Sequence, residues 1–305
     1  MKVCFVGSGS IGKRHIKNFI QLCIRRNIKN EVHLLRSSSK KIEGIESLIA
    51  KEVYCYERLD KHYDAIFITN PTNLHYNTIN MLKHKSNYFF VEKPVFHINN
   101  ININTLELDK NVYYVACPLR YTSVVLKAKE IINKEDVYSV RVISSSYLPD
   151  WRKNVDYRKT YSAHKEQGGG VRIDLIHEWD YLIFLFGRPK EVKSLSGTYS
   201  DLDIDSEDIA VYIAQYEDKI IELHLDYFGR KVRRSFEVRT KDHEYIFDIA
   251  NMEIWQDGRL IERFHDELND MYIREMENFY DIMSKRRRSN NNLEDALMVL
   301  RVTGM

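Results

Sequence analysis

Short apolar segments alternate with amphipathic segments over the first part of the chain. Apolar runs at residues 3–6, 32–35, 65–69, 88–91 and 112–116 predict buried strands, and 53–56 predicts a weaker one. Residues 10–25 and 74–83 predict helices, the first because Ile11, Ile16, Phe19 and Cys23 recur at helical spacing. Strands and helices in this alternation predict a parallel sheet.

The pattern changes after Leu119. A predicted helix at 123–133 leads into alternating apolar and polar segments at 138–147, 191–199, 208–216, 219–227 and 234–240, which predict antiparallel strands. A helix at 171–186 interrupts them, and helices at 267–285 and 293–301 close the chain. We therefore expect an α/β chain: a doubly wound parallel sheet in residues 1–120, then an α+β domain with a mostly antiparallel, open sheet in 121–305.

Composition narrows the class of protein. A length of 305 residues suggests two domains, and the near balance of 46 basic and 44 acidic residues argues against a nucleic-acid partner. No apolar run is long enough for a membrane span, and the N-terminal run is too short for a signal peptide. The four cysteines lack metal-site spacing, so we expect reduced thiols, no metal, and a cytoplasmic protein.

A glycine motif stands between the first predicted strand and the first predicted helix. It reads Gly7, Ser8, Gly9, Ser10, Ile11, Gly12, which is a G-x-G-x-x-G pattern. Missing side chains allow a tight turn and close approach of a pyrophosphate, and the helix N-terminus adds free N–H groups and partial positive charge. The motif predicts dinucleotide binding, and the alternative is a purely structural turn.

The end of the second predicted strand bears on the choice of cofactor. An acidic residue that would bind the ribose 2′-hydroxyl is absent there, and Arg36 and Ser37 open a stretch of hydroxyls and lysines. Cations and hydroxyls suit a 2′-phosphate, so we expect NADP in preference to NAD. The alternative is an ordinary basic loop.

Three of the five prolines follow successive predicted parallel strands. Pro71, Pro94 and Pro118 stand beside Asn70, beside Glu92 and Lys93, and beside Arg120, respectively. The carboxyl ends of parallel strands form the ligand-binding edge of such sheets. Charged and amide groups beside all three prolines favour a site there over simple strand termination.

Taken together, these motifs resemble the glucose–fructose oxidoreductase/inositol dehydrogenase family, known as Gfo/Idh/MocA. The resemblance rests on the glycine motif, T-N-P-T-x-x-H at 69–75, E-K-P at 92–94, and the glycine-rich start at 168–170 of a helix with Asp174 and His177. The form D-L-x-H-E-x-D-Y is similar to the branch found in surface-polysaccharide and sugar-modification pathways. The resemblance implies a Rossmann domain for NAD(P) and a second domain for substrate binding and oligomerisation.

The resemblance also implies roles for single residues. His177 would act as acid/base and Lys93 would stabilise alkoxide charge, while Asp174, three residues from His177 and on the same helical face, would orient substrate or His177. Many family members space this Asp and His four apart. Asn70 and Glu92 would contact the nicotinamide ribose. The remaining expected contacts to cofactor or substrate are Pro71, Asn73, His75, Arg120 and Tyr121.

The predicted loop at 148–167 is long and rich in aromatic and basic residues. Arginines and aromatic rings would suit the diphosphate and base or sugar of a nucleotide-linked sugar. The expected substrate-binding residues there are Trp151, Arg152, Tyr157, Arg158 and Tyr161. A solvated loop or an oligomer contact is the alternative.

These observations predict an NAD(P)-dependent oxidoreductase that acts on the carbinol or keto carbon of a sugar or nucleotide-linked sugar in glycan or surface-polysaccharide biosynthesis. A dehydrogenase of a free polyol or small carbonyl compound is the first alternative. A non-catalytic sensor that binds cofactor and sugar is the second. Family members often form dimers or tetramers through the sheet of the second domain. Alternating apolar residues at Ile209, Val211 and Ile213 are compatible with such a homo-oligomer, and packing of the same face on helices is the alternative.

Overall fold

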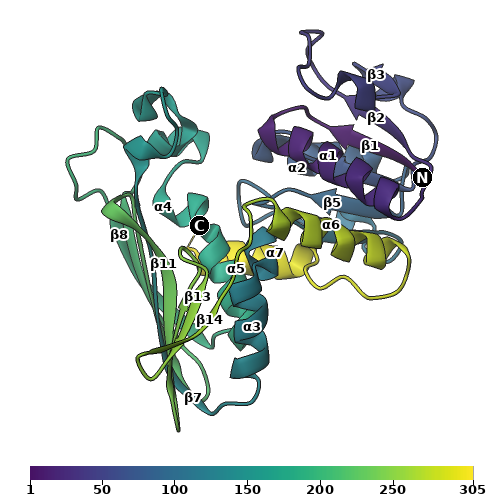
Figure 1. Ribbon diagram of the computed structural model, residues 1–305. Helices are drawn as coiled ribbons and strands as arrows, with labels where there is room; N and C mark the ends of the chain where they lie inside the picture. The colour runs from purple at the N-terminus through teal and green to yellow at the C-terminus, as the bar shows by residue number, and fades with distance from the viewer. Residues whose placement is uncertain (305) are drawn as a thin grey trace. The chain divides into compact units, whose positions relative to one another are not determined.

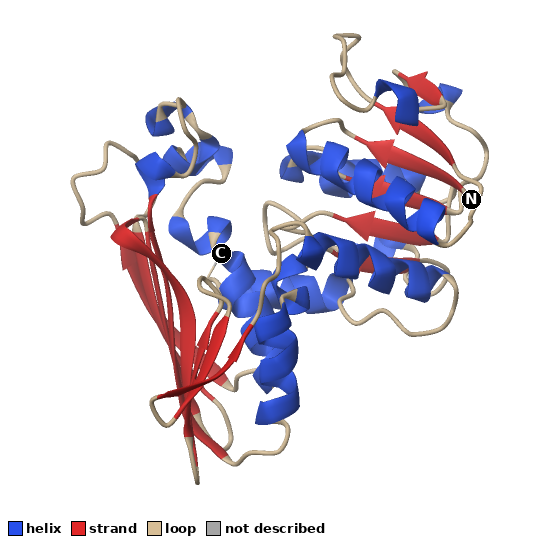
Figure 2. Cartoon of the chain, viewed as in Figure 1, coloured by secondary structure: helices blue, strands red, loops and turns tan. Residues whose placement is uncertain are grey.

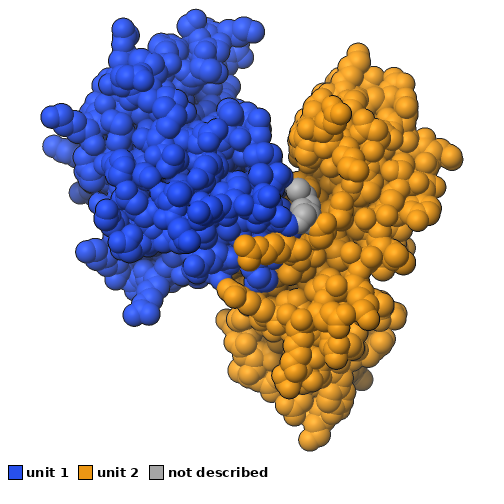
Figure 3. All heavy atoms as spheres, turned by 180° about the vertical axis from the view of Figure 1, so that it is seen from behind, with its two compact units in different colours: residues 1–118, 268–300 blue, residues 119–267, 301–305 orange. Residues whose placement is uncertain are grey.

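The computed structural model describes residues 1–304, which form two compact units. The first unit comprises residues 1–118 and 268–300, and the second comprises residues 119–267 with the C-terminal residues from Arg301 (Figure 3).

A six-stranded parallel sheet forms the centre of the first unit (Figure 1), with strand order β3-β2-β1-β4-β5-β6. The strands are β1 (Lys2–Val6), β2 (Glu31–Leu35), β3 (Lys51–Val53), β4 (Ala65–Ile68), β5 (Tyr88–Val91) and β6 (Val112–Val115). The chain leaves β1 on one side for β2 and β3 and returns on the other for β4, so the order reverses between β1 and β4. Dinucleotides bind at such a reversal point.

The helices of the first unit are α1 (Ser10–Arg25), α2 (His75–Leu82), α6 (Asp270–Met283) and α7 (Leu293–Val302, whose last two residues fall outside the unit). The expected division at residue 120 lies close to the observed boundary, but residues 268–300 join the first unit instead of the second. Aromatic side chains account for this difference. Phe279 of α6 is fully buried, with its ring centroid 5.4 Å from that of Phe67 in β4 and 5.3 Å from that of Phe90 in β5.

An eight-stranded sheet forms most of the second unit (Figure 2), with order β14-β13-β12-β11-β7-β10-β9-β8. The strands are β7 (Val137–Tyr147), β8 (Glu191–Gly197), β9 (Ile209–Gln215), β10 (Ile220–Asp226), β11 (Phe228–Thr240), β12 (Glu244–Asp248), β13 (Glu253–Gln256) and β14 (Arg259–Arg263). The helices are α3 (Ser123–Ile132), α4 (Val171–Asp174) and α5 (Ile176–Phe186). β7 pairs with β10 in parallel, and the other neighbours pair antiparallel, as the predicted mostly antiparallel sheet requires.

One face of this sheet is buried and the other is open. In β9, Ala210, Tyr212 and Ala214 are buried, whereas the alternate residues Val211 and Ile213 are exposed. Leu195 of β8 lies directly opposite Val211 and is also exposed, so the open face carries apolar side chains.

Three strands of the second unit are absent from the sequence prediction, namely β12, β13 and β14. Among residues 1–304, no helix has both the length and the apolar character needed to cross a membrane.

Candidate functional site

The glycine motif forms the turn between β1 and α1, at the point where the strand order reverses. Gly7 has φ +99°, and a Cβ there would lie 2.9 Å from the backbone nitrogen of Asn70. A Cβ on Gly12 would lie 2.7 Å from the carbonyl oxygen of Gly7 and 2.8 Å from Oγ1 of Thr69. Both glycines are therefore required by the close approach of the turn to the end of β4.

Gly9 differs from the other two glycines of the motif because a Cβ there would meet no atom of the described residues within 4 Å, apart from its own chain neighbours. Gly9 is also the N-cap of α1, no side chain caps the helix, and no acidic residue stands in its first turn. Open space beside an uncapped helix N-terminus, free of negative charge, fits the pyrophosphate of a dinucleotide.

Arg36 follows β2 at the same edge of the sheet and is largely buried. Its guanidinium donates to the carbonyl oxygen of Lys40 and lies 3.5 Å from a carboxylate oxygen of Glu52 in β3. Ser37 is exposed beside it. The sheet thus brings a carboxylate next to the arginine, although residues 36–42, directly after β2, include no acidic residue.

The segment after β4 is fixed by His75. Its ring nitrogens lie 2.9 Å from the carbonyl oxygen of Asn70 and 3.0 Å from that of Val95, so His75 joins the ends of β4 and β5. Burial lowers the pKa of His75. Pro71 and Asn73 are exposed, whereas His75 is buried. The amide nitrogen of Asn70 donates to Thr78, while its buried Oδ1 has no partner in the described part of the chain.

Glu92 and Lys93 follow β5 at this edge. Glu92 is buried, and Oε1 of its carboxylate lies 2.5 Å from Nε2 of His15 in α1. The side chain of Lys93 is partly exposed, and its backbone N–H donates to Oε2 of Glu92 over 3.1 Å.

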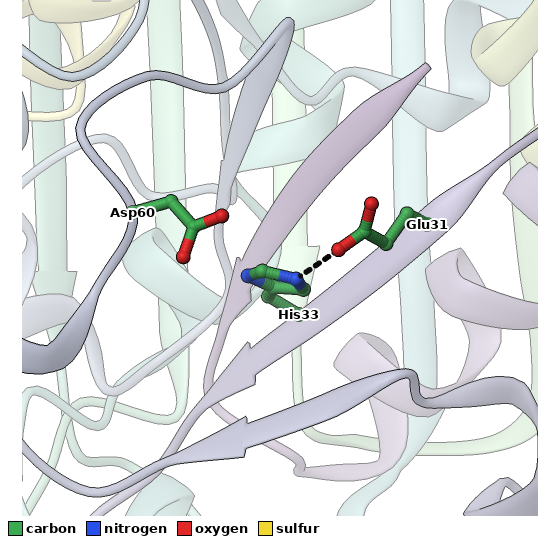
Figure 4. A group of neighbouring side chains, drawn as sticks. All are labelled: Glu31, His33 and Asp60. Carbon is green, nitrogen blue, oxygen red and sulfur yellow. Dashed lines mark hydrogen bonds and ion pairs between the residues drawn. The ribbon is translucent and has the colours of Figure 1, made fainter.

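A separate cluster of ionisable groups lies at the opposite, amino edge of the sheet (Figure 4). His33 contacts Glu31 at 2.7 Å through Nε2 and the hydroxyl of Tyr63 at 3.0 Å through Nδ1. The carboxylate of Asp60 accepts from the ammonium groups of Lys2 at 2.6 Å and Lys51 at 2.8 Å. These two lysines supply the positive charge that a metal ion would otherwise bring, so we interpret the cluster as an ion-pair network.

In the second unit, glycines allow close backbone approach before α4. A Cβ on Gly169 would clash with the carbonyl oxygens of Tyr161 and Ser162. The predicted single helix at 171–186 is divided at Leu175, whose φ of −99° and ψ of 24° depart from helical values. Asp174 ends α4 and is buried, whereas His177 lies in the first turn of α5 and is half-buried. The prediction that one continuous helix carries both Asp174 and His177 is therefore wrong, because the backbone turns at Leu175, between the two residues.

Aromatic side chains surround the carboxylate of Asp174. Tyr227 donates from its hydroxyl to Oδ2 of Asp174 over 2.7 Å, and the Trp151 ring packs edge-on against the Tyr227 ring at 5.2 Å. Burial, followed by the charge of Asp174, raises the pKa of both Tyr227 and Tyr161. The guanidinium of Arg152 lies 5.9 Å from the centre of the Tyr161 ring.

The predicted loop at 148–167 is divided into short 3-10 helices and is held by an acidic loop at 201–208. Asp203 donates its backbone N–H to the hydroxyl of Tyr157, and its carboxylate lies 3.7 Å from Arg158. Arg158 also donates to both oxygens of Asp156, at 2.9 and 3.0 Å. The positive charge of Arg158 is therefore largely balanced within the protein.

Arg120 and Tyr121 are both buried at the start of the second unit. The Arg120 guanidinium makes a bidentate pair with Asp180 of α5, at 2.8 and 2.7 Å. This pairing gives Arg120 an evident role in holding α5, beyond the cofactor contact expected from the sequence.

His15 and Tyr227 were missed by reasoning from sequence. His15 stands four residues from both Ile11 and Phe19, on the apolar face of α1, and a histidine in that position is a signal that was available. Nothing in the pattern distinguishes Tyr227 from the other tyrosines of the strands.

Two family models match most of the chain. Residues 1–112 match the model described as "Oxidoreductase family, NAD-binding Rossmann fold", and residues 125–242 match the "GFO/IDH/MocA C-terminal domain". A curated relative, the "Uncharacterized oxidoreductase YrbE" of Bacillus subtilis (strain 168), is 24% identical over 191 residues. That match spans 60% of this chain and only 52% of the relative.

Solved structures support the same fold. A levoglucosan dehydrogenase in complex with NADH and levoglucosan has a TM-score of 0.85 at 15% identity, with 100% of this chain and 95% of the other covered. UDP-N-acetylglucosamine 3-dehydrogenase from Acidithiobacillus ferrooxidans has a TM-score of 0.78 at 15% identity, with 99% and 95% covered. At such identities the likeness establishes the fold, and the two family models establish the kinship: this chain belongs to the Gfo/Idh/MocA family of oxidoreductases.

Proposed function

We propose that this protein is an NAD(P)-dependent oxidoreductase that acts on the carbinol or keto carbon of a sugar or nucleotide-linked sugar, in glycan or surface-polysaccharide biosynthesis. One observation carries the proposal. The open Gly9 turn after β1 and Lys93 after β5 stand at the same carboxyl edge of one parallel sheet, so a phosphate-binding turn and a cation for chemistry share one edge.

The cofactor would be held by the residues of this edge. The N-terminus of α1 would receive the pyrophosphate at Gly9. Asn70, whose buried Oδ1 has no partner among residues 1–304, would contact the nicotinamide ribose. Arg36 and Ser37 would favour the 2′-phosphate of NADP, with NAD as the alternative. When bound, the nicotinamide supplies or accepts the hydride.

The protein would supply the proton and the charge stabilisation. His177 would take the hydroxyl proton of the substrate or return it to the carbonyl oxygen, because imidazole titrates near neutral pH. The ammonium of Lys93 would stabilise the negative charge that develops on that oxygen. Asp174, oriented by Tyr227, would fix the substrate or His177.

A nucleotide-linked sugar is the favoured substrate class. The sequence D-L-I-H-E-W-D-Y at 174–181 resembles the surface-polysaccharide branch, and the Acidithiobacillus protein of similar fold is a dehydrogenase of UDP-N-acetylglucosamine. Trp151, Arg152 and Tyr161 would contact the sugar or the nucleotide.

A free sugar or polyol is the second candidate. Arg158 is paired with Asp156 and Asp203, and Tyr157 is bonded to Asp203, so these two residues offer less to a diphosphate than the sequence suggests. The levoglucosan dehydrogenase of similar fold is in complex with levoglucosan, which fits this candidate.

We also propose that the protein is cytoplasmic and that it forms a dimer or tetramer. The exposed Leu195, Val211 and Ile213 on the open sheet face would pack against a second copy. Replacing Ile213 with Lys would then shift the mass measured by light scattering toward that of a single chain.

The function is tested with wild-type protein, Lys93→Ala and His177→Ala, each incubated with NADPH or NADP and a panel of nucleotide sugars, free sugars and polyols. We expect all three proteins to bind cofactor, and each variant to lose about 10²-fold or more of turnover. Near-normal rates in both variants would reject the assigned residues. Cofactor binding without turnover by the wild type across the panel would instead support a sensor.

A further inference from the structure

His15 is a fully buried histidine on α1, one turn after the glycine motif. Its ring packs edge-on against the rings of Phe90, at 4.8 Å, and Tyr272, at 6.0 Å. A polar ring in such apolar surroundings is costly unless it is hydrogen-bonded. Its Nδ1 is buried and has no partner in the described part of the chain, so the polar interaction of the ring is concentrated at Nε2.

The partner of Nε2 is the carboxylate of Glu92. The two groups approach to 2.5 Å, and the exposed fraction of the Glu92 side chain is only 10%. Burial by itself would raise the pKa of Glu92, but the hydrogen bond and charge of His15, together with Lys93, hold that pKa below its usual value. Glu92 is therefore an ionised group whose charge is balanced by its neighbours.

The second oxygen of Glu92 is also engaged inside the protein. It accepts the backbone N–H of Lys93 over 3.1 Å, while the first oxygen faces His15. An unbroken chain of hydrogen bonds thus runs from α1 through Glu92 to the backbone of Lys93. These hydrogen bonds link α1, which follows β1, to the segment that follows β5. In the sheet, β4 lies between β1 and β5.

We propose that His15 and Glu92 are a positioning pair, which holds the backbone of Lys93 in register with the helix that receives the cofactor pyrophosphate. This inference rests on the proposed function, in which Lys93 stabilises negative charge on the substrate oxygen. A shift of about 1 Å in a reacting group can reduce a rate about 10²-fold, so the pair governs turnover more than cofactor affinity. Glu92 then acts through Lys93, instead of by direct contact with the nicotinamide ribose.

Three variants test the pair. His15→Phe keeps an aromatic ring, slightly larger than imidazole, and removes the donor. His15→Gln keeps an N–H donor on a side chain without a ring, and Glu92→Gln removes the charge of the acceptor. For each folded variant we would measure kcat, KM, the Kd for NADPH, and hydrogen exchange of the Lys93 amide in cofactor-free protein. The exchange measurement reports the hydrogen bond to Glu92 without requiring any substrate.

We expect His15→Phe to lower kcat about tenfold or more, with Kd changed less than about threefold and faster exchange at the Lys93 amide. His15→Gln should recover most of the kcat. Because the two residues act as a unit, the double variant His15→Phe/Glu92→Gln should be little slower than either single variant. The double variant also removes the buried unpaired charge, so it provides a folded protein if His15→Phe is unstable.

Unchanged exchange at the Lys93 amide in His15→Phe, or in the double variant, would overturn the proposal. A tenfold loss of NADPH affinity with unchanged kcat would also overturn it, because the pair would then serve the cofactor alone. The variant Lys93→Ala tests the proposed function independently of the positioning pair. Normal turnover in Lys93→Ala rejects the role of Lys93, whereas exchange at the Lys93 amide in His15→Phe still decides whether the pair holds the backbone.

Discussion

The hydroxyl of Tyr227 donates to the carboxylate of Asp174 over 2.7 Å and so fixes the last residue of α4 from the end of β10. The two residues are 53 positions apart in the sequence. Tyr227 is fully buried, and its ring also meets Trp151 of the 148–167 segment. A residue at the bend between β10 and β11 therefore sets the orientation of a proposed site residue.

Replacing Tyr227 with Phe removes this donor and keeps the ring. We expect kcat to fall about tenfold and the unit to lose about 1–3 kcal/mol of stability, because a buried carboxylate loses a hydrogen bond. Steady-state kinetics and thermal unfolding measure the two effects. Tyr216→Phe is the matched control, since Tyr216 donates to the carbonyl oxygen of Gly187, a backbone group with no proposed role. Equal kcat losses in the two variants would show that Tyr227 has no specific link to Asp174.

Local patterns predicted most of the first unit. The helix expected at 10–25 is observed as Ser10–Arg25, and the strand expected at 88–91 is observed as Tyr88–Val91. Such elements are specified by their own apolar spacing and by flanking glycine or proline. Strands β12, β13 and β14 were missed because they are short, and their stability comes from pairing with neighbours that the sequence does not reveal.

Long-range contacts account for what sequence could not predict about the units and the site. The apolar face of α6 is evident from its spacing, but only the folded chain shows that Phe279 packs against Phe67 and Phe90. The contact of His15 with Glu92 spans 77 residues. Motifs predicted site roles for Glu92 and Asp174, whereas the side chains that contact them, His15 and Tyr227, belong to no motif.

Gly9 and Gly12 of the motif should respond differently to replacement by alanine. Gly12→Ala places a Cβ 2.7 Å from the carbonyl oxygen of Gly7, so we expect loss of stability together with loss of cofactor binding. A Cβ on Gly9 would meet no atom of residues 1–304 within 4 Å beyond its own chain neighbours, so we expect Gly9→Ala to keep a normal unfolding temperature. The Kd for NADPH should rise about tenfold or more, since the methyl group would occupy the position proposed for the pyrophosphate. Circular dichroism and fluorescence titration measure the two quantities. Unaltered NADPH affinity in a folded Gly9→Ala variant would argue against a pyrophosphate at this turn.

Arg36 and Glu52 should set the preference between cofactors in opposite directions. Arg36→Ala removes the cation proposed for the 2′-phosphate, so NADPH affinity should fall about tenfold while NADH affinity changes little. Glu52→Gln removes the carboxylate that lies 3.5 Å from the guanidinium, so NADPH affinity should rise severalfold. Titration of each variant with both cofactors gives the ratio of Kd values. A fall in NADPH affinity on Glu52→Gln would mean that Glu52 helps to hold Arg36 in its binding position.

The stability of the second unit should depend on pH through Asp226. Its carboxylate accepts from Ser145 at 3.0 Å, from His224 at 3.0 Å, and from the backbone N–H groups of Phe228 and Gly229 at 3.1 and 2.8 Å. Burial opposes ionisation, but these donors lower the pKa of Asp226 below its usual value. The ionised form therefore stabilises the folded state above the unfolded pKa of about 3.9, and this contribution declines as pH falls through the lower, folded pKa.

Asp226→Asn keeps one acceptor oxygen and removes the charge, so it isolates the ionic part of this contribution. At neutral pH we expect a loss of about 1 kcal/mol, and the difference from wild type should shrink steadily below about pH 4. All three tryptophans, Trp151, Trp179 and Trp255, lie in the second unit, so urea unfolding followed by tryptophan fluorescence reports on that unit. Asp218→Asn is the control, because the exposed Asp218 also has a lowered pKa, from its pair with Lys219, but is open to solvent screening. A difference between Asp226→Asn and wild type that stays constant from pH 7 to about pH 3 would place the role of Asp226 in geometry instead of charge.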